Sequence, residues 1–106
     1  MAELDGGAPE LRIETRPGPP PLISLAGELD SSNAARLSAT VETALAERPE
    51  RVVFELSDLR FMDSAGIAVL VRLAAEVDVV ELRDPSPIVR RIIEITGLTG
   101  VLRVEP

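Results

Sequence analysis

The chain has 106 residues, a net charge of −7 and a hydrophobic fraction of 45% that is almost wholly aliphatic, with two Phe and no Trp or Tyr. This length suits one small domain, and the lack of both a basic face and aromatic platforms argues against nucleic-acid binding. Because the chain has no His and no Cys, it has no Ser-His-Asp triad, no imidazole or thiolate metal ligand and no disulfide, so we expect no catalytic residue, no metal site and no cofactor.

The N-terminal residues 1–10, MAELDGGAPE, are small, polar and rich in Gly, and they predict a flexible tail. They lack the basic and apolar regions of a signal peptide. Apolar runs elsewhere fall short of the roughly 18–20 residues that a membrane span needs. We therefore expect a single domain over residues 11–106, without membrane association and located in the cytoplasm.

The segment after the tail predicts a β-hairpin. LRIETR, residues 11–16, alternates apolar and polar side chains as a half-buried strand does. PGPPP, residues 17–21, interrupts regular structure. LISLAGELD, residues 22–30, then begins a second strand, so the two strands are expected to be joined by a rigid, Pro-rich connection.

Residues 30–50, DSSNAARLSATVETALAERPE, predict an amphipathic helix. Asp30, Ser31 and Ser32 offer side-chain oxygens for the N-cap, and Pro49 ends the helix. Its buried stripe is expected to consist of Leu37, Val41, Ala44 and Leu45.

Three further elements follow in alternation. RVVFEL, residues 51–56, is rich in β-branched residues and predicts a strand in the interior of the sheet. GIAVLVRLAA, residues 66–75, is apolar on nearly all sides and predicts a well-buried helix. VDVVEL, residues 77–82, predicts another strand.

Residues 84–98, DPSPIVRRIIEITGL, carry the fullest set of helix signals in the chain. Ser86 is expected at the N-cap, Pro87 at the first helical position and Gly97 at a left-handed C-cap, followed by the apolar contact of Leu98. The buried stripe is expected to be Ile88, Val89, Ile92 and Ile93. A last strand, VLRV at residues 101–104, completes the order β-β-α-β-α-β-α-β. The sequence thus predicts an α/β fold with a small mixed β-sheet and helices packed on it.

The turn between the strand at 51–56 and the next helix contains Asp63, Ser64, Ala65 and Gly66. Functional groups gather at such carboxyl ends of strands, and free N–H groups at a helix start attract anions. Asp and Ser are also ordinary capping residues, so the residues alone leave a structural and a functional interpretation open. A nucleophilic Ser64 is not expected, because it lies outside a G-x-S-x-G motif and the chain has no His.

Three segments together resemble the STAS domain of bacterial anti-sigma-factor antagonists. They are GELD at 27–30, FMDSAGI at 61–67 and SPIVRRIIEITGL at 86–98, and the likeness extends over residues 11–104. Many relatives have a second Ser at the position of Ala65, and they commonly have a longer connection than the one between Leu73 and Val80. They also commonly continue into another helix beyond the position of Pro106.

The resemblance implies a partner switch in which Ser64 is phosphorylated by an anti-sigma factor that is a serine protein kinase. The unphosphorylated form binds the anti-sigma factor and frees a sigma factor, and a serine phosphatase acting on phospho-Ser64 restores binding. The implied partner-binding residues are Asp30, Asp63, Ser64, Ala65 and Gly66, with helix capping as the alternative role of the two aspartates. N–H groups at the helix start are expected to soften the cost of the phosphate, while Asp63 adds repulsion.

A second function stays open on the same resemblance. The chain could be a non-switching STAS scaffold, a subunit of a larger regulatory or lipid-transport assembly. Only the switch predicts transfer of phosphate to Ser64.

Overall fold

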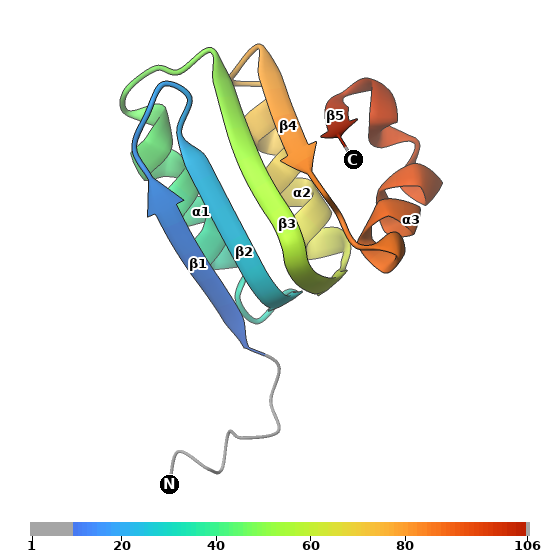
Figure 1. The fold of residues 1–106 in the computed structure, drawn as a ribbon. Coiled ribbons are helices and arrows are strands. Elements are labelled where there is room, and N and C mark those ends of the chain that lie inside the picture. Colours follow the sequence, from blue (N-terminus) through green and yellow to red (C-terminus); the bar gives the residue numbers. More distant parts are fainter. Residues whose placement is uncertain (1–9, 106) are drawn as a thin grey trace, which may run out of the picture.

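A five-stranded sheet and three α-helices make up residues 10–105, the part of the chain that the computed structural model describes (Figure 1). The predicted flexible tail lies, except for Glu10, outside the described residues. The element order predicted from the sequence is confirmed. The elements in chain order are β1 Leu11–Arg16, β2 Leu22–Leu29, α1 Ala34–Leu45, β3 Arg51–Met62, α2 Ser64–Ala74, β4 Val79–Arg83, α3 Pro87–Thr96, a 3-10 turn Leu98–Gly100 and β5 Leu102–Glu105.

The sheet is mixed, and its strands lie in sequence order from β1 to β5. β1 and β2 form the predicted antiparallel hairpin, whereas β2, β3, β4 and β5 run parallel to one another. Each parallel connection contains a helix, as such crossovers require. β3 is longer than the predicted residues 51–56, and two register shifts occur along its pairing with β2.

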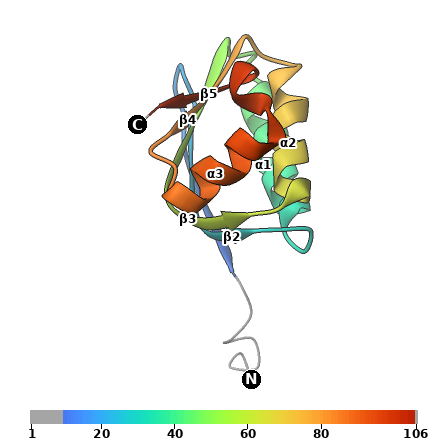
Figure 2. The same ribbon diagram turned by 90° about the vertical axis from the view of Figure 1, so that its right-hand side faces the viewer.

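The hydrophobic core lies between the sheet and the helices. α1 and α2 lie next to each other on one face of the sheet, and α3 lies beyond β4, where it packs on β3 and the 3-10 turn (Figures 1 and 2). α2 buries five residues, as its apolar sequence predicts, while α1 buries only Leu37 and Val41. Burial of this apolar surface is the main force that holds the three helices on the sheet.

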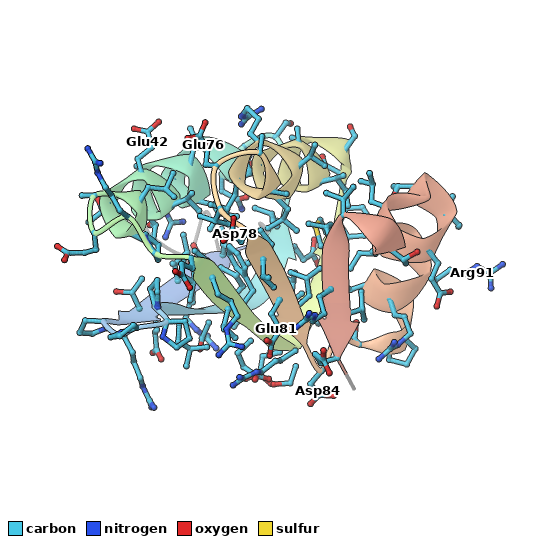
Figure 3. All side chains as sticks on the ribbon, turned by 90° about the horizontal axis from the view of Figure 1, so that it is seen from above. Glu42, Glu76, Asp78, Glu81, Asp84 and Arg91 are labelled. Atoms are coloured by element: carbon cyan, nitrogen blue, oxygen red, sulfur yellow. The ribbon has the colours of Figure 1, made fainter. Side chains whose placement is uncertain are left out.

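The opposite face of the sheet carries no helix within residues 10–105 (Figure 3). Charged side chains cover it instead. Glu81 at its centre is buried, and its carboxylate lies 2.6 Å from Nε of Arg83 and 3.7 Å from Arg51. The hydrogen bond that Arg83 donates to Glu81, together with the charge of that carboxylate, raises the pKa of Arg83 above its ordinary value. A buried carboxylate is tolerated here because two guanidinium groups balance its charge.

Two details of the predicted helices are wrong. α1 begins at Ala34, so its N-cap position belongs to Asn33 and not to Asp30, Ser31 or Ser32. In α3 the caps Ser86 and Gly97 are as predicted, but Ile88 is 60% exposed and only Val89 and Ile93 of the expected stripe are fully buried. Val89, in the same first turn, is fully buried, so the buried face of α3 runs through Val89 and Ile93, and Ile88 lies to one side of it.

The short connection from α2 to β4 is closed by backbone hydrogen bonds. Val77 N–H donates to the carbonyl of Leu73, and the N–H groups of Asp78 and Val79 donate to the carbonyl of Glu50. β4 therefore starts in register with β3 directly after the helix ends. Among residues 10–105 no helix is long and apolar enough to cross a membrane.

Candidate functional site

The predicted site forms where β2 and β3 end. Leu29 and Met62 are paired in the parallel register of these strands, so the residues that follow them, Asp30 and Asp63, come to lie at the same edge of the sheet. Asp63 N–H donates to the carbonyl of Leu29 at 3.1 Å and ties the two chain segments together. The GELD and DSAG segments, far apart in the sequence, thus form one surface.

Asp63 is the N-cap of α2. Its carboxylate accepts hydrogen bonds from Ala65 N–H at 2.8 Å and Gly66 N–H at 3.3 Å. The carbonyl of Asp63 also accepts the N–H of Ile67, which is the first intrahelical bond. The structural role of Asp63 is therefore confirmed, and it engages two of the N–H groups that the first turn of a helix leaves without partners.

Ser64 is the first residue of α2, and it is exposed. Within residues 10–105 no hydrogen bond involves its hydroxyl group, so Ser64 does not cap the helix. Asp63 already binds the N–H groups of Ala65 and Gly66. The expectation that N–H groups at the helix start soften the cost of a phosphate stays a prediction. A phosphate on Ser64 would extend toward solvent, next to a carboxylate of the same sign.

The loop after β2 is held by a residue that the sequence interpretation missed. Asn33 is only 6% exposed; its side chain accepts the N–H of Asp30 and donates to the carbonyl of Glu28. Asp30 itself accepts the N–H of Ser32 at 2.9 Å. Asp30 therefore shapes its own turn, while the buried amide of Asn33 fixes that turn against the end of β2.

Gly66 has a packing role within the site. A Cβ atom at this position would lie 2.6 Å from Cδ2 of Leu29 and 2.9 Å from Cγ of Met62. Both neighbours are fully buried, so a larger residue would push the first turn of α2 away from β2 and β3. Gly66 thus sets how closely Ser64 approaches the Asp30 turn.

We expect Gly66→Ala to lower the free energy of unfolding by roughly 1–2 kcal/mol. The clash with Leu29 should outweigh the helix-propensity gain of about 1 kcal/mol that Ala otherwise brings. Urea denaturation followed by circular dichroism measures this change. Gly100→Ala is the matched control, because a Cβ at Gly100 meets nothing within 4 Å; equal stability of both variants would contradict the packing role.

Phe61 adds an apolar group to the same edge of the sheet. It is 40% exposed, and it is paired in register with Glu28, whereas the neighbouring Met62 is buried. The sequence carries a signal for this exposure, because adjacent side chains of a strand point to opposite faces and Phe61 and Met62 cannot both enter the core. Glu28 forms an ion pair at 3.8 Å with Arg60 close by.

The arrangement suits binding and modification rather than catalysis. Ser64 has an accessible hydroxyl group but no neighbouring base, since the chain has no His. Within residues 10–105 no group of three or more carboxylates could hold a metal ion. What the site offers is an exposed hydroxyl on a rigid turn, flanked by a structured acidic loop and one exposed aromatic ring.

Comparisons with known proteins identify the family and the fold. Residues 14–104 match the family model described as Mlab, STAS domain. BtrV of Bordetella bronchiseptica, which is assigned as an anti-sigma factor antagonist, is 31% identical over 78% of this chain and 75% of its own. The anti-sigma F factor antagonist of Lysinibacillus sphaericus is 29% identical over 73% of this chain and 70% of its own.

Solved structures agree with this result. The anti-sigma factor antagonist from Mycobacterium paratuberculosis, at 23% identity, shares the fold with a TM-score of 0.83 over 92% of this chain and 86% of its own. Unphosphorylated SpoIIAA, an anti-sigma factor antagonist, has a TM-score of 0.70 at 27% identity over 92% and 87% of the two chains. The phosphorylated form of Bacillus SpoIIAA has a TM-score of 0.62 at 26% identity over 92% and 90%.

The fold and the DSAG turn therefore define a STAS domain. The chain belongs to the STAS family of anti-sigma factor antagonists. Members of this family are regulatory binding proteins, so the chain is not an enzyme.

Proposed function

We propose that the chain is an anti-sigma-factor antagonist whose binding is switched by phosphorylation of Ser64. In the unphosphorylated state it binds an anti-sigma factor that is a serine kinase, and a sigma factor is released. Phosphorylation of Ser64 ends the binding, and a serine phosphatase restores it. These events place the chain in the cytoplasm, where sigma factors act, and they require neither nucleic acid nor a membrane.

The observation that carries the proposal is the exposure of Ser64 on a turn in which Asp63 already engages the backbone N–H groups of Ala65 and Gly66. Because Asp63 binds these two N–H groups, a phosphate on Ser64 gains little compensation from them inside the domain. The phosphate adds nearly two negative charges at neutral pH. Its main effect then falls on the partner, which has to accommodate charge and bulk where it previously met a hydroxyl group.

The partner surface that we propose consists of the exposed Ser64, the half-buried Asp30, Asp63 and Ala65, and Phe61 at its edge. Gly66 contributes by packing, because it is buried against Leu29. The relatives support the proposed kind of function: they include anti-sigma factor antagonists, and SpoIIAA is known in a phosphorylated and an unphosphorylated form.

The test is phosphate transfer from ATP in the presence of the cognate anti-sigma factor, with mass-spectrometric mapping of the product. We expect one phosphate per chain, on Ser64. Ser31, Ser32 and Ser57 are also exposed and serve as internal controls. Phosphate on any of these instead of Ser64 would contradict the switch, and stable binding without any transfer would favour the non-switching scaffold.

A further inference from the structure

The outer edge of β1 is an unpaired strand edge. Among residues 10–105, β1 is the first strand of the sheet and pairs only with β2. The carbonyl of Glu10 accepts the N–H of Glu28, so the backbone groups of Arg12, Glu14 and Arg16 point toward β2 by the alternation of an antiparallel ladder. The N–H and C=O groups of Leu11, Ile13 and Thr15 consequently point outward, and they form a row that another strand could pair with.

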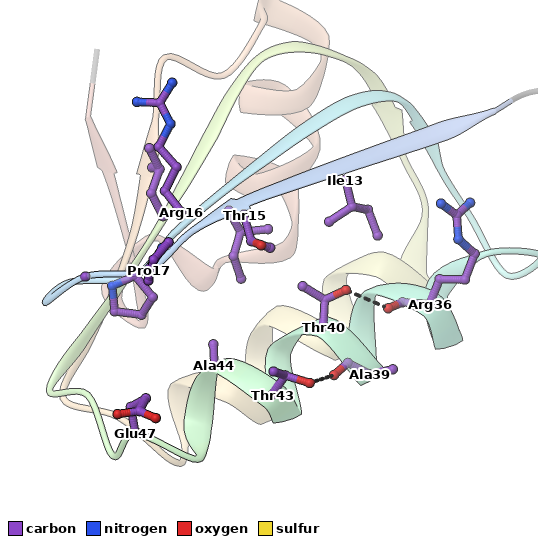
Figure 4. Close-up of a pocket in the computed structure, with 14 residues that line it drawn as sticks. Ile13, Thr15, Arg16, Pro17, Arg36, Ala39, Thr40, Thr43, Ala44 and Glu47 are labelled. Atoms are coloured by element: carbon purple, nitrogen blue, oxygen red, sulfur yellow. Dashed lines mark hydrogen bonds between the residues drawn. The ribbon is translucent and has the colours of Figure 1, made fainter.

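The side chains of β1 are sorted by face. Arg12, Glu14 and Arg16 are exposed on the open face of the sheet, while Leu11 is buried and Ile13 half-buried on the helix face. Figure 4 shows Ile13 and Thr15 above α1, with Arg16 extending to the other side of the sheet. Within residues 10–105 no ion pair involves Arg12, Glu14 or Arg16, so these charges are available to a neighbour.

The flank of β1 is sterically open. A groove of about 700 Å³ separates β1 from α1, and small side chains of Ala39, Thr40, Thr43 and Ala44 form its helix wall (Figure 4). The hydroxyl groups of both threonines donate to backbone carbonyls of their own helix, which leaves their methyl groups on the surface. The longer side chains of this wall, Arg36 and Glu47, lie at its two ends, so the middle of the wall beside β1 is formed by small side chains.

We propose that a second copy of this chain pairs antiparallel with β1 across a two-fold axis centred on Ile13. In this register Arg12 lies opposite Glu14 of the second copy, and Glu10 lies opposite Arg16, each twice by symmetry. Ile13 meets its own equivalent on the helix face, and Leu11 meets Thr15. The outward groups of Leu11, Ile13 and Thr15 form the hydrogen-bond ladder, and the two sheets join into one.

Charge selects this register over its neighbours. Centring the pair on Arg12 would place Arg12 against itself and Glu10 against Glu14, and centring it on Glu14 would place Glu14 against itself. Like charges directly opposite each other destabilise a strand pair, whereas opposite charges stabilise it. The interface contains neither Asp30 nor Ser64, so the inference does not depend on the proposed function.

Sedimentation velocity over a concentration series, with purified full-length chain, tests the dimer. We expect the parent to dimerise reversibly, and both Glu14→Arg and Arg12→Glu to raise the dissociation constant roughly tenfold or more, because each turns two attractive pairs into repulsive ones. Mixing these two variants should restore association as a heterodimer. In the mixed pair, the two acidic side chains of the Arg12→Glu copy face the two basic side chains of the Glu14→Arg copy.

Glu42→Arg is the matched control, because it makes the same charge change at an exposed position of α1 that does not line the groove. It should leave the dissociation constant unchanged. Circular dichroism should show all variants folded, since the three side chains are exposed. The proposal would be overturned if the parent stayed monomeric at high micromolar concentration. It would also be overturned if neither charge reversal changed the dissociation constant of the dimer.

Discussion

Ser64→Glu should bind the anti-sigma factor roughly a hundredfold more weakly than the parent, whereas Ser64→Ala should bind like the parent and stay bound when ATP is added. The glutamate places a charge next to Asp63 at the centre of the proposed surface, and losing a close contact of this kind typically costs a few kcal/mol. The alanine only removes the hydroxyl group that accepts phosphate. Titration calorimetry with and without ATP measures both effects.

The stability of both Ser64 variants should stay within about 0.5 kcal/mol of the parent, as for other exposed positions without hydrogen bonds. Asp63 caps α2, so neither Ser64→Ala nor Ser64→Glu removes the capping hydrogen bonds. Ser57→Glu is the matched control, because it introduces the same charge at an exposed serine on β3. Equal affinity of the Ser64→Ala and Ser64→Glu variants would refute the switch and leave the scaffold function.

Ile93→Asp should abolish or nearly abolish folding. Ile93 is fully buried in α3, and a carboxylate there would have no partner and would leave water at a cost of several kcal/mol. Small domains are stable by about 5–15 kcal/mol, so this single change removes a large share of the total. Thermal unfolding followed by circular dichroism should show a much lower midpoint or no transition.

Ile88→Asp makes the same chemical change five residues earlier in the same helix. Ile88 is 60% exposed, so its aspartate stays in water, and it lies near the helix start, where a negative charge is favourable. We expect its unfolding midpoint to stay close to that of the parent. If both variants unfold alike, the packing of α3 on β3 is not as described.

Local signals along the chain were sufficient for the element order and for the limits of α3. Ser86, Pro87 and Gly97 act through hydrogen bonds and backbone angles within a few residues, so they can be recognised in the sequence. The same holds for the hairpin of β1 and β2, where the prolines of the connection separate two alternating segments. The resemblance to STAS domains rested on motifs of this local kind.

The burial of individual helix residues was less predictable, because it depends on which strands and helices pack against each residue. Ile88 fits the stripe of α3 by spacing, yet the buried face of the helix runs through Val89 and Ile93 and leaves Ile88 exposed. Asn33, and not one of the three predicted capping residues, holds the N-cap position of α1, and its side chain bonds to Glu28 and Asp30 at the end of β2 instead of capping the helix. Which of the neighbouring polar residues takes the N-cap position therefore depends on where β2 ends, and the local sequence does not show this.

The sequence by itself determined the fold class, the family and the candidate residues Asp30, Asp63 and Ser64. Only the tertiary structure decided how these residues divide their roles. The parallel register of Leu29 with Met62 brings Asp30 and Asp63 to one edge, Asp63 binds the helix N–H groups, and Ser64 is left exposed. Strand register and hydrogen-bond competition arise from contacts between segments distant in the chain, so no local pattern encodes them.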